Sequence, residues 1–171
     1  MNSSGSTDLI DHVLGLTPPS STHAARVFRD KVRHGTQASY EALFSPELHL
    51  DLGVRWLVTV YATQLTQAQE LHQHYVTQAQ QASVPSQWLE AVAADQPNAI
   101  SDPIVQAILI FTRTLTLKPI EGDKAAIQQL EQAGVPTPDC ITLSQLIAFL
   151  SYQVRLVTGL KAMQRLESRD V

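Results

Sequence analysis

Two residues with the types and spacing needed for chemistry lie in the glutamine-rich stretch QAQELHQHYVTQAQQ, residues 67–81. Glu70 and His74 are four residues apart, which places two side chains on the same face of a helix. A histidine that titrates near neutrality can act as a general base, and a carboxylate one turn away can orient its ring. The alternative is an ordinary polar helix face, where such a pair contributes only about 0.2–0.5 kcal/mol.

His72 and His74 form an H-x-H sequence that resembles a chelating pair. On a helix, however, two residues at this spacing point about 200° apart and cannot bind the same ion. A metal site at Glu70 and His74 would need ligands from other helices, and spacing singles out none of the remaining histidines, His12, His23, His34 and His49. We therefore predict neither a metal nor a cofactor.

Arg55 interrupts the run 50–65, which is otherwise almost entirely apolar. Because a buried arginine needs partners, it could bind a substrate carboxylate or pair with Glu70. A straight helix would separate these two residues by about 22 Å, so direct pairing requires a helix break near Thr66 or a neighbouring chain. The interpretation that we favour is an exposed first turn, on which Arg55 forms a surface ion pair.

Cys140 is the only cysteine, so the chain cannot form an intramolecular disulfide or run a two-cysteine redox cycle. It follows the sequence PTPD near the start of the last predicted helix, and a helix N-terminus can lower the pKa of a thiol. A lone reactive thiol is therefore one interpretation. We favour the other, a small packed residue beside a turn.

The composition limits the partners of the chain. Its net charge is −4 without a Lys/Arg cluster, which argues against nucleic acid as a partner. We find no apolar run near the roughly 18–20 residues of a membrane span, and the N-terminus MNSSGSTDLIDHV does not resemble a signal peptide. We therefore expect no membrane partner and a cytoplasmic location. Charged residues make up only 16%, which leaves uncharged surface for subunit contacts and suggests a homo-oligomer.

Helical periodicity and end signals predict an all-α fold built from helix hairpins, and the pattern contains no alternating strand-like runs. We predict a disordered segment 1–7 and a single all-α domain 8–171, which the length of 171 residues accommodates. The expected helices cover residues 7–16, 21–35 with Gly35 as C-cap, 36–46, 50–65, 66–82, 85–95, 101–119, 121–134 and 137–170.

Residues 108–160 read ILIFTRTLTLKPIEGDKAAIQQLEQAGVPTPDCITLSQLIAFLSYQVRLVTGL. This stretch is similar to the C-terminal part of the carboxymuconolactone decarboxylase and alkylhydroperoxidase-D-like superfamily. The shared order is a helix ending in T..P, a helix ending in L..AG(V/L), and a long helix ending in (N/S)(F/Y)..R...GL. The resemblance covers about residues 45–161 and implies an oligomeric, all-α protein, with 8–44 as an N-terminal extension such as peroxidase-related members carry.

Active members carry C-x-x-C-x-x-x-H on the central helix and a glutamate about three turns upstream. With His74 as the histidine, the cysteine positions fall at Gln67 and Glu70, and the glutamate position falls at Arg55. With His72 as the histidine, the cysteine positions fall at two apolar residues, Leu65 and Ala68. Both thiols are absent in either register. The composition therefore excludes a two-cysteine peroxidase mechanism, and the resemblance implies a degenerate site.

The resemblance and the residues together support two functional hypotheses. In the first, the chain performs non-thiol acid–base chemistry on a small organic substrate, with His74 and Glu70 as catalytic residues. In the second, it is a non-catalytic binding or scaffolding subunit of an oligomer. Decarboxylase-type relatives act on a lactone without thiols, so an enzyme remains compatible with the missing cysteines.

Overall fold

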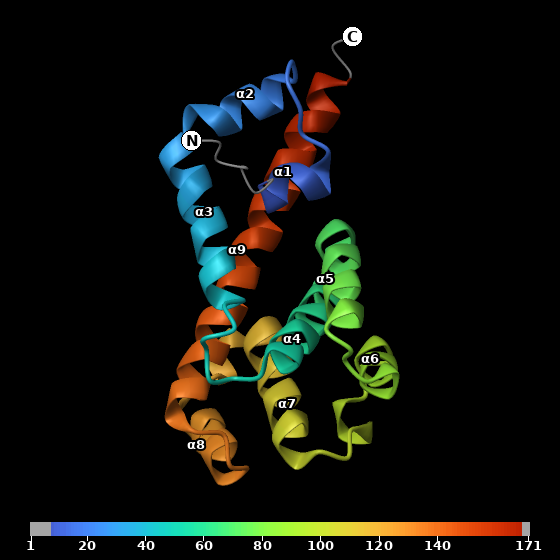
Figure 1. Cartoon of the computed structure of the whole chain (residues 1–171), viewed down its shortest axis with the longest axis vertical. Coiled ribbons are helices and arrows are strands. Elements are labelled where there is room, and N and C mark those ends of the chain that lie inside the picture. The colour runs from blue at the N-terminus through green and yellow to red at the C-terminus, as the bar shows by residue number, and fades with distance from the viewer. Residues whose placement is uncertain (1–7, 169–171) are drawn as a thin grey trace. The chain divides into compact units, whose positions relative to one another are not determined.

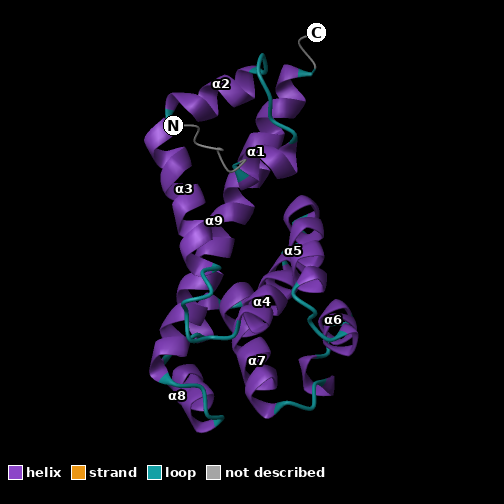
Figure 2. Ribbon diagram, viewed as in Figure 1, coloured by secondary structure: helices purple, strands orange, loops and turns teal. Residues whose placement is uncertain are grey.

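The computed structural model describes residues 8–168, and every regular element in this part of the chain is a helix (Figures 1 and 2). The prediction of an all-α fold is confirmed, whereas the predicted disordered segment 1–7 lies outside the described residues. The α-helices are α1 (Leu9–Leu14), α2 (Ser21–Phe28), α3 (Asp30–Leu43), α4 (Leu52–Leu65), α5 (Gln69–Gln81), α6 (Ser86–Ala93), α7 (Pro103–Leu117), α8 (Lys124–Gln132) and α9 (Thr137–Glu167), with short 3₁₀ helices η1 (Pro97–Ala99) and η2 (Pro119–Glu121).

The chain divides into two compact units. One comprises residues 1–42 and 155–171, and the other comprises residues 43–154. The helices α4 to α8 lie wholly in the second unit, to which α9 contributes its first part. Our assignment of one domain with an extension 8–44 and a core 45–161 stays a prediction.

Helix α4 is the centre of the unit 43–154. Every residue from Val54 to Thr63 is buried, as the unbroken apolar pattern predicted, and α4 contacts α5, α6 and α7 (Figure 1). A helix buried on all sides must be covered by several neighbours, which contribute apolar side chains to one core. The largest fully buried apolar side chains of this unit are Leu57, Tyr61, Leu71, Tyr75, Ile108, Leu109, Leu130, Leu143, Leu146 and Ile147.

Side-chain caps fix where these helices start. Asp51, Asp102 and Asp123 each accept a hydrogen bond from a backbone N–H in the first turn of α4, α7 and α8, respectively. Such caps satisfy amide groups that have no partner within the helix. The first break after α4 spans residues 66–68, where Gln67 has a φ of 55°, so the helical register restarts at Gln69. The spacing of Glu70 and His74 is thus set within one helix, α5.

The predicted helix end at Gly35 is wrong. Helix α2 stops at Phe28, and Gly35 lies inside α3, outside the left-handed region that a glycine C-cap adopts. The break falls at Arg29, which has non-helical backbone angles of φ −102° and ψ 47°. A glycine is a weak end signal when the polar residues after it continue the helical pattern, as they do here up to Leu43.

Helix α9 corrects another expectation from sequence. By length and composition alone it is long and apolar enough to cross a membrane, although core helices of soluble proteins meet the same criterion. Within residues 43–154 its side chains Leu143, Leu146 and Ile147 are almost fully buried. This apolar stretch therefore packs against other helices of its unit, and the absence of a membrane partner stays a prediction.

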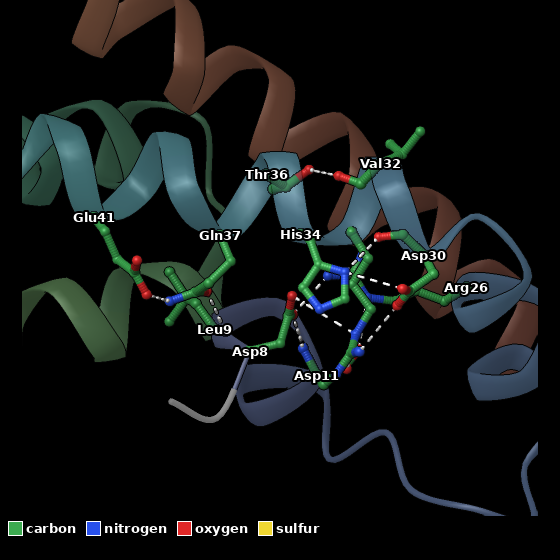
Figure 3. Close-up of polar contacts among 11 residues, drawn as sticks. Asp8, Leu9, Asp11, Arg26, Asp30, Val32, His34, Thr36, Gln37 and Glu41 are labelled. Carbon is green, nitrogen blue, oxygen red and sulfur yellow. Dashed lines mark hydrogen bonds and ion pairs between the residues drawn. The ribbon is translucent and has the colours of Figure 1, made fainter. Parts of the chain in front are cut away.

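The unit that contains α1, α2 and α3 is held together by a cluster of charged side chains (Figure 3). Arg26 on α2 lies 2.6 Å from Asp8 and 2.6 Å from Asp11, and Arg33 on α3 lies 2.9 Å from Asp11. The side chains of Arg26, Asp8 and Asp11 are all buried, and charges in such a place are tolerated only when they compensate one another. This cluster joins α1 to α2 and α3.

Candidate functional site

Glu70 and His74 lie one turn apart on α5, and both are half-buried. Glu70 occupies the first turn, where the positive end of the helix dipole favours a carboxylate. The ring of His74 meets that of Tyr75 edge-on, with 5.2 Å between the ring centroids. The helix therefore presents the two predicted residues together at the border of the core, and their catalytic role stays a prediction.

Tyr75, the neighbour of His74, forms a buried polar pair with Gln153. The hydroxyl of Tyr75 donates to Oε1 of Gln153 on α9 at 2.5 Å, and both side chains are completely buried. Phe44 stacks on Trp56 at 3.7 Å, and both rings lie 6.1 Å from that of Tyr75. The amide Nε2 of Gln153 is buried in this apolar surrounding, and within the described structure it has no hydrogen-bond partner. Burying a donor without a hydrogen-bond partner costs free energy, so an acceptor that reached this nitrogen would be bound favourably.

His72 lies on the other flank of α5, as the helical geometry predicts. Its Nδ1 is 3.2 Å from the carbonyl oxygen of Val60 and 3.2 Å from Oγ1 of Thr63, both on α4. Because a carbonyl oxygen only accepts, this contact favours the tautomer with the proton on Nδ1. His72 thus connects α5 to α4, while His74 contacts Tyr75. Among the described residues, no group of three histidine, cysteine or acidic side chains could hold a metal ion.

Arg55 does not form the surface ion pair that we favoured from the sequence. Its side chain is 1% exposed, and it donates from Nε to the Leu50 carbonyl at 2.9 Å and from Nη1 to the Leu43 carbonyl at 2.6 Å. Burial lowers the pKa of the guanidinium, while the carboxylates of Asp51 and Asp139 oppose this shift. Arg55 therefore fixes both ends of the connection between α3 and α4.

The sequence pattern gave no sign of this role, because the two acceptors are backbone carbonyls that any residue carries. The helix does break after α4, which was the condition for pairing Arg55 with Glu70. The two described hydrogen bonds of the guanidinium nevertheless go to the backbone.

Cys140 is a packed residue in the first turn of α9, as favoured from the sequence. It is 3% exposed, and its thiol donates to the Val135 carbonyl at 3.8 Å. Burial raises the pKa of the thiol, and the nearby carboxylates Glu131 and Asp139 raise it further. A reactive cysteine requires the opposite shift, so the structure argues against a reactive thiol here.

Two residues that the sequence pattern did not single out, Gln153 and His49, form polar contacts with residues far away in the chain. Gln153 is one of many glutamines, and its partner Tyr75 lies 78 positions away in the chain. His49 was counted only as a spare histidine, yet its Nδ1 lies 2.9 Å from the buried carboxylate of Asp139, 90 positions away. No local pattern announces either pair, because each depends on how α9 packs against distant segments.

Comparison with known proteins supports the fold. No family model matches the chain, and no curated protein matches it. The crystal structure of an uncharacterized peroxidase-related protein from Silicibacter sp. TM1040 superposes with a TM-score of 0.72, covering 90% of this chain and 79% of that one at 18% sequence identity. This similarity shows the fold alone: the chain shares its helical architecture with that peroxidase-related protein. The single cysteine shows that the chain lacks the C-x-x-C pair.

Proposed function

We propose that this chain binds a small organic molecule beside Glu70 and His74 and acts on it by acid–base chemistry without a thiol. One observation carries the proposal. A half-buried carboxylate and imidazole lie one turn apart on α5, next to a buried Tyr75–Gln153 pair whose amide Nε2 has no partner among the described residues. A base, a residue that orients it, and a donor for a substrate oxygen are the minimum for proton abstraction next to a carbonyl group.

In this mechanism His74 removes a proton from a carbon next to the carbonyl group of the substrate. Glu70 stabilises the imidazolium that forms, as a neighbouring carboxylate does. Negative charge develops on the carbonyl oxygen of the substrate, and this oxygen accepts a hydrogen bond from Nε2 of Gln153. The proton then returns from His74 to another carbon of the substrate, so the overall reaction is an isomerisation that needs no redox partner.

The proposal is tested with α-angelica lactone, a small unsaturated lactone whose double-bond shift changes its ultraviolet absorption. We expect saturable isomerisation that falls about 10²-fold or more in His74→Ala, the usual contribution of a general base. Gln153→Leu should lower the rate as well, because it removes the donor and keeps a similar volume. His72→Ala is the matched control, since it removes the other histidine of α5. Catalysis unchanged in His74→Ala, or absent across a panel of small lactones and keto acids, contradicts the proposal.

A specific observation also favours the second candidate, a non-catalytic subunit of a homo-oligomer. Arg55, at the position where the resemblance places a glutamate, binds two backbone carbonyls and so has a structural role. If the site has lost its chemistry in this way, assembly is the property that remains. Sedimentation velocity then shows a stable oligomer while the lactone panel shows no turnover, and a monomer at all concentrations contradicts this alternative.

A further inference from the structure

A cavity lies between α7 and α8, away from α5. Its volume is about 300 Å³, at the lower end of the range of small-molecule clefts. Its wall consists of side chains spaced three or four residues apart on each helix, so one face of α7 opposes one face of α8. These residues are Pro103, Gln106, Ala107, Ile110, Phe111, Thr114, Ala126, Gln129, Leu130 and Ala133.

The hollow exists because alanines occupy positions where larger side chains would fill it. Ala107 on α7 and Ala126 on α8 line the cavity, whose floor includes the nearly buried Phe111 and Leu130. Atoms that border an empty space lose the dispersion contacts that a packed interior provides. Ile110 also lines it and is 40% exposed, so an apolar molecule in the cavity would remove this side chain from water.

The polar groups of the lining define the ligand further. The Gln106 amide Nε2 donates to the carbonyls of Asn98 at 3.1 Å and Ile100 at 3.4 Å, which leaves its Oε1 as the group for a ligand. The Thr114 hydroxyl donates to the Ile110 carbonyl at 3.0 Å, so its oxygen can only accept from a ligand. All the described residues that line the cavity are uncharged. The cavity therefore suits a neutral molecule that donates a hydrogen bond.

We infer that the α7–α8 cavity is a binding site for a small, neutral, mainly apolar molecule that carries one hydrogen-bond donor, such as an aromatic amine, a phenol or an alcohol. The site is separate from Glu70 and His74 and does not depend on the proposed chemistry there. Because such a ligand is small and makes few polar contacts, its Kd is expected on the order of 100 μM.

The experiment uses two fluorescent probes of the same skeleton with the full-length chain. N-phenyl-1-naphthylamine is neutral with one N–H donor, and 1-anilinonaphthalene-8-sulfonate adds a sulfonate. Ala126→Leu fills the cavity. Ala125→Leu is the matched control, because it places the same side chain at the preceding position of α8, which is exposed. Both replacements retain good helix formers, and circular dichroism confirms that each variant is folded.

We expect saturable binding of the neutral probe, at least tenfold weaker binding in Ala126→Leu, and unchanged binding in Ala125→Leu. The sulfonate probe should bind several-fold more weakly than the neutral one, because its charge would lose hydration in an uncharged cavity. Three results overturn the inference: no saturable binding, equal losses in both variants, or equal affinity for both probes. If Ala126→Leu instead weakens only self-association in sedimentation experiments, a second copy of the chain covers this groove and the inference is also wrong.

Discussion

At the scale of single residues, Arg55 shows how a buried guanidinium can direct its hydrogen bonds to backbone carbonyls. Its guanidinium binds the Leu43 carbonyl at the end of α3 and the Leu50 carbonyl just before α4. The side chain therefore defines the path of the connection between these residues, on which Phe44 stacks against Trp56. Sequence reasoning could identify the arginine as unusual, but it could not find acceptors that have no side-chain signature.

We predict that Arg55→Met lowers the free energy of unfolding by at least about 2 kcal/mol. Methionine fills much of the space but leaves two carbonyl acceptors without their donors, and each such buried group costs about 1–3 kcal/mol. Urea denaturation measures the change. Arg29→Met is the control, because Arg29 is exposed and should change the stability by less than about 0.5 kcal/mol. A loss below 1 kcal/mol for Arg55→Met would show that water replaces the guanidinium easily.

Cys140 gives a second residue-scale prediction. Because burial and two nearby carboxylates raise the pKa of its thiol, less thiolate is present at any given pH than in the unfolded chain. We expect the folded protein to react with Ellman's reagent at pH 8 at least about tenfold more slowly than the urea-unfolded protein. Equal rates in the two states would instead identify an accessible, reactive cysteine.

At the scale of helices, the junction after α6 depends on a three-residue polar cluster. Asp95 has a φ of 53° and accepts hydrogen bonds from the hydroxyl of Tyr61 on α4 and from Arg113 on α7 at 3.0 Å. The hydrogen bonds from Arg113 and Tyr61 lower the pKa of the Asp95 carboxyl. Burial raises the pKa of the Tyr61 hydroxyl, and its contact with the Asp95 carboxylate raises it further, while Arg113 opposes this shift. One carboxylate thus ties the loop after α6 to two helices.

The lowered pKa of Asp95 determines how the stability contributed by its contacts with Tyr61 and Arg113 depends on pH. A carboxylate whose pKa is lower in the folded state contributes stability above its unfolded pKa, and this contribution is lost as the pH falls through the folded pKa. We expect Asp95→Asn to cost up to about 1 kcal/mol, since the pair with Arg113 is half-exposed and asparagine tolerates the left-handed backbone.

The cost of Asp95→Asn should be constant between pH 8 and pH 5 and should shrink as the pH falls below 3.8, the ordinary pKa of aspartate. Urea denaturation of both proteins across this range measures it, with Glu47→Gln as an exposed control. A difference that persists unchanged at pH 3 would mean that ionisation of Asp95 is irrelevant to the junction.

Two glycines test the assignment of helix ends. Gly35 lies inside α3, and a Cβ atom built there meets nothing within 4 Å, so Gly35→Ala should stabilise the protein by about 0.5–1 kcal/mol. Gly15 caps α1 with a φ of 60°, and Gly15→Ala should destabilise it by about 1 kcal/mol. Thermal unfolding compares the two variants. A destabilising Gly35→Ala would restore the helix end that the sequence pattern suggested.

At the scale of the whole molecule, the helical fold does not determine which chemistry the chain can perform. The helical fold matches a peroxidase-related protein, yet one cysteine cannot supply both the attacking and the resolving thiol of a two-cysteine cycle. With His74 as the histidine of the motif, the position of the first thiol is occupied by Gln67, whose backbone is left-handed. The helical fold is therefore present in a chain that lacks the C-x-x-C pair.

We predict that the protein does not reduce tert-butyl hydroperoxide with dithiothreitol as the electron donor at a rate above that of the Cys140→Ala variant. A coupled assay of residual peroxide measures the two rates. Saturable turnover that depends on both the dithiol and Cys140 would contradict this prediction and would require a one-cysteine mechanism, in which dithiothreitol itself resolves the oxidised thiol.

Much of this molecule follows from local sequence. The all-α class and the helices predicted over residues 50–65, 85–95 and 101–119 depend on residues within a few positions of one another, so periodicity and end signals find them. The candidate pair Glu70 and His74 is predictable for the same reason, since one helix fixes its spacing. The absence of a two-cysteine mechanism follows from composition alone.

Only the tertiary structure decided which polar groups are buried and what they contact. The carbonyl partners of Arg55, the pairing of Tyr75 with Gln153 and the orientation of His49 by Asp139 depend on packing between segments distant in sequence. The cavity between α7 and α8 likewise exists only because two helix faces oppose each other. A helical pattern states which face of each helix is apolar, but the energy of a buried polar group depends on the neighbour that packing places beside it.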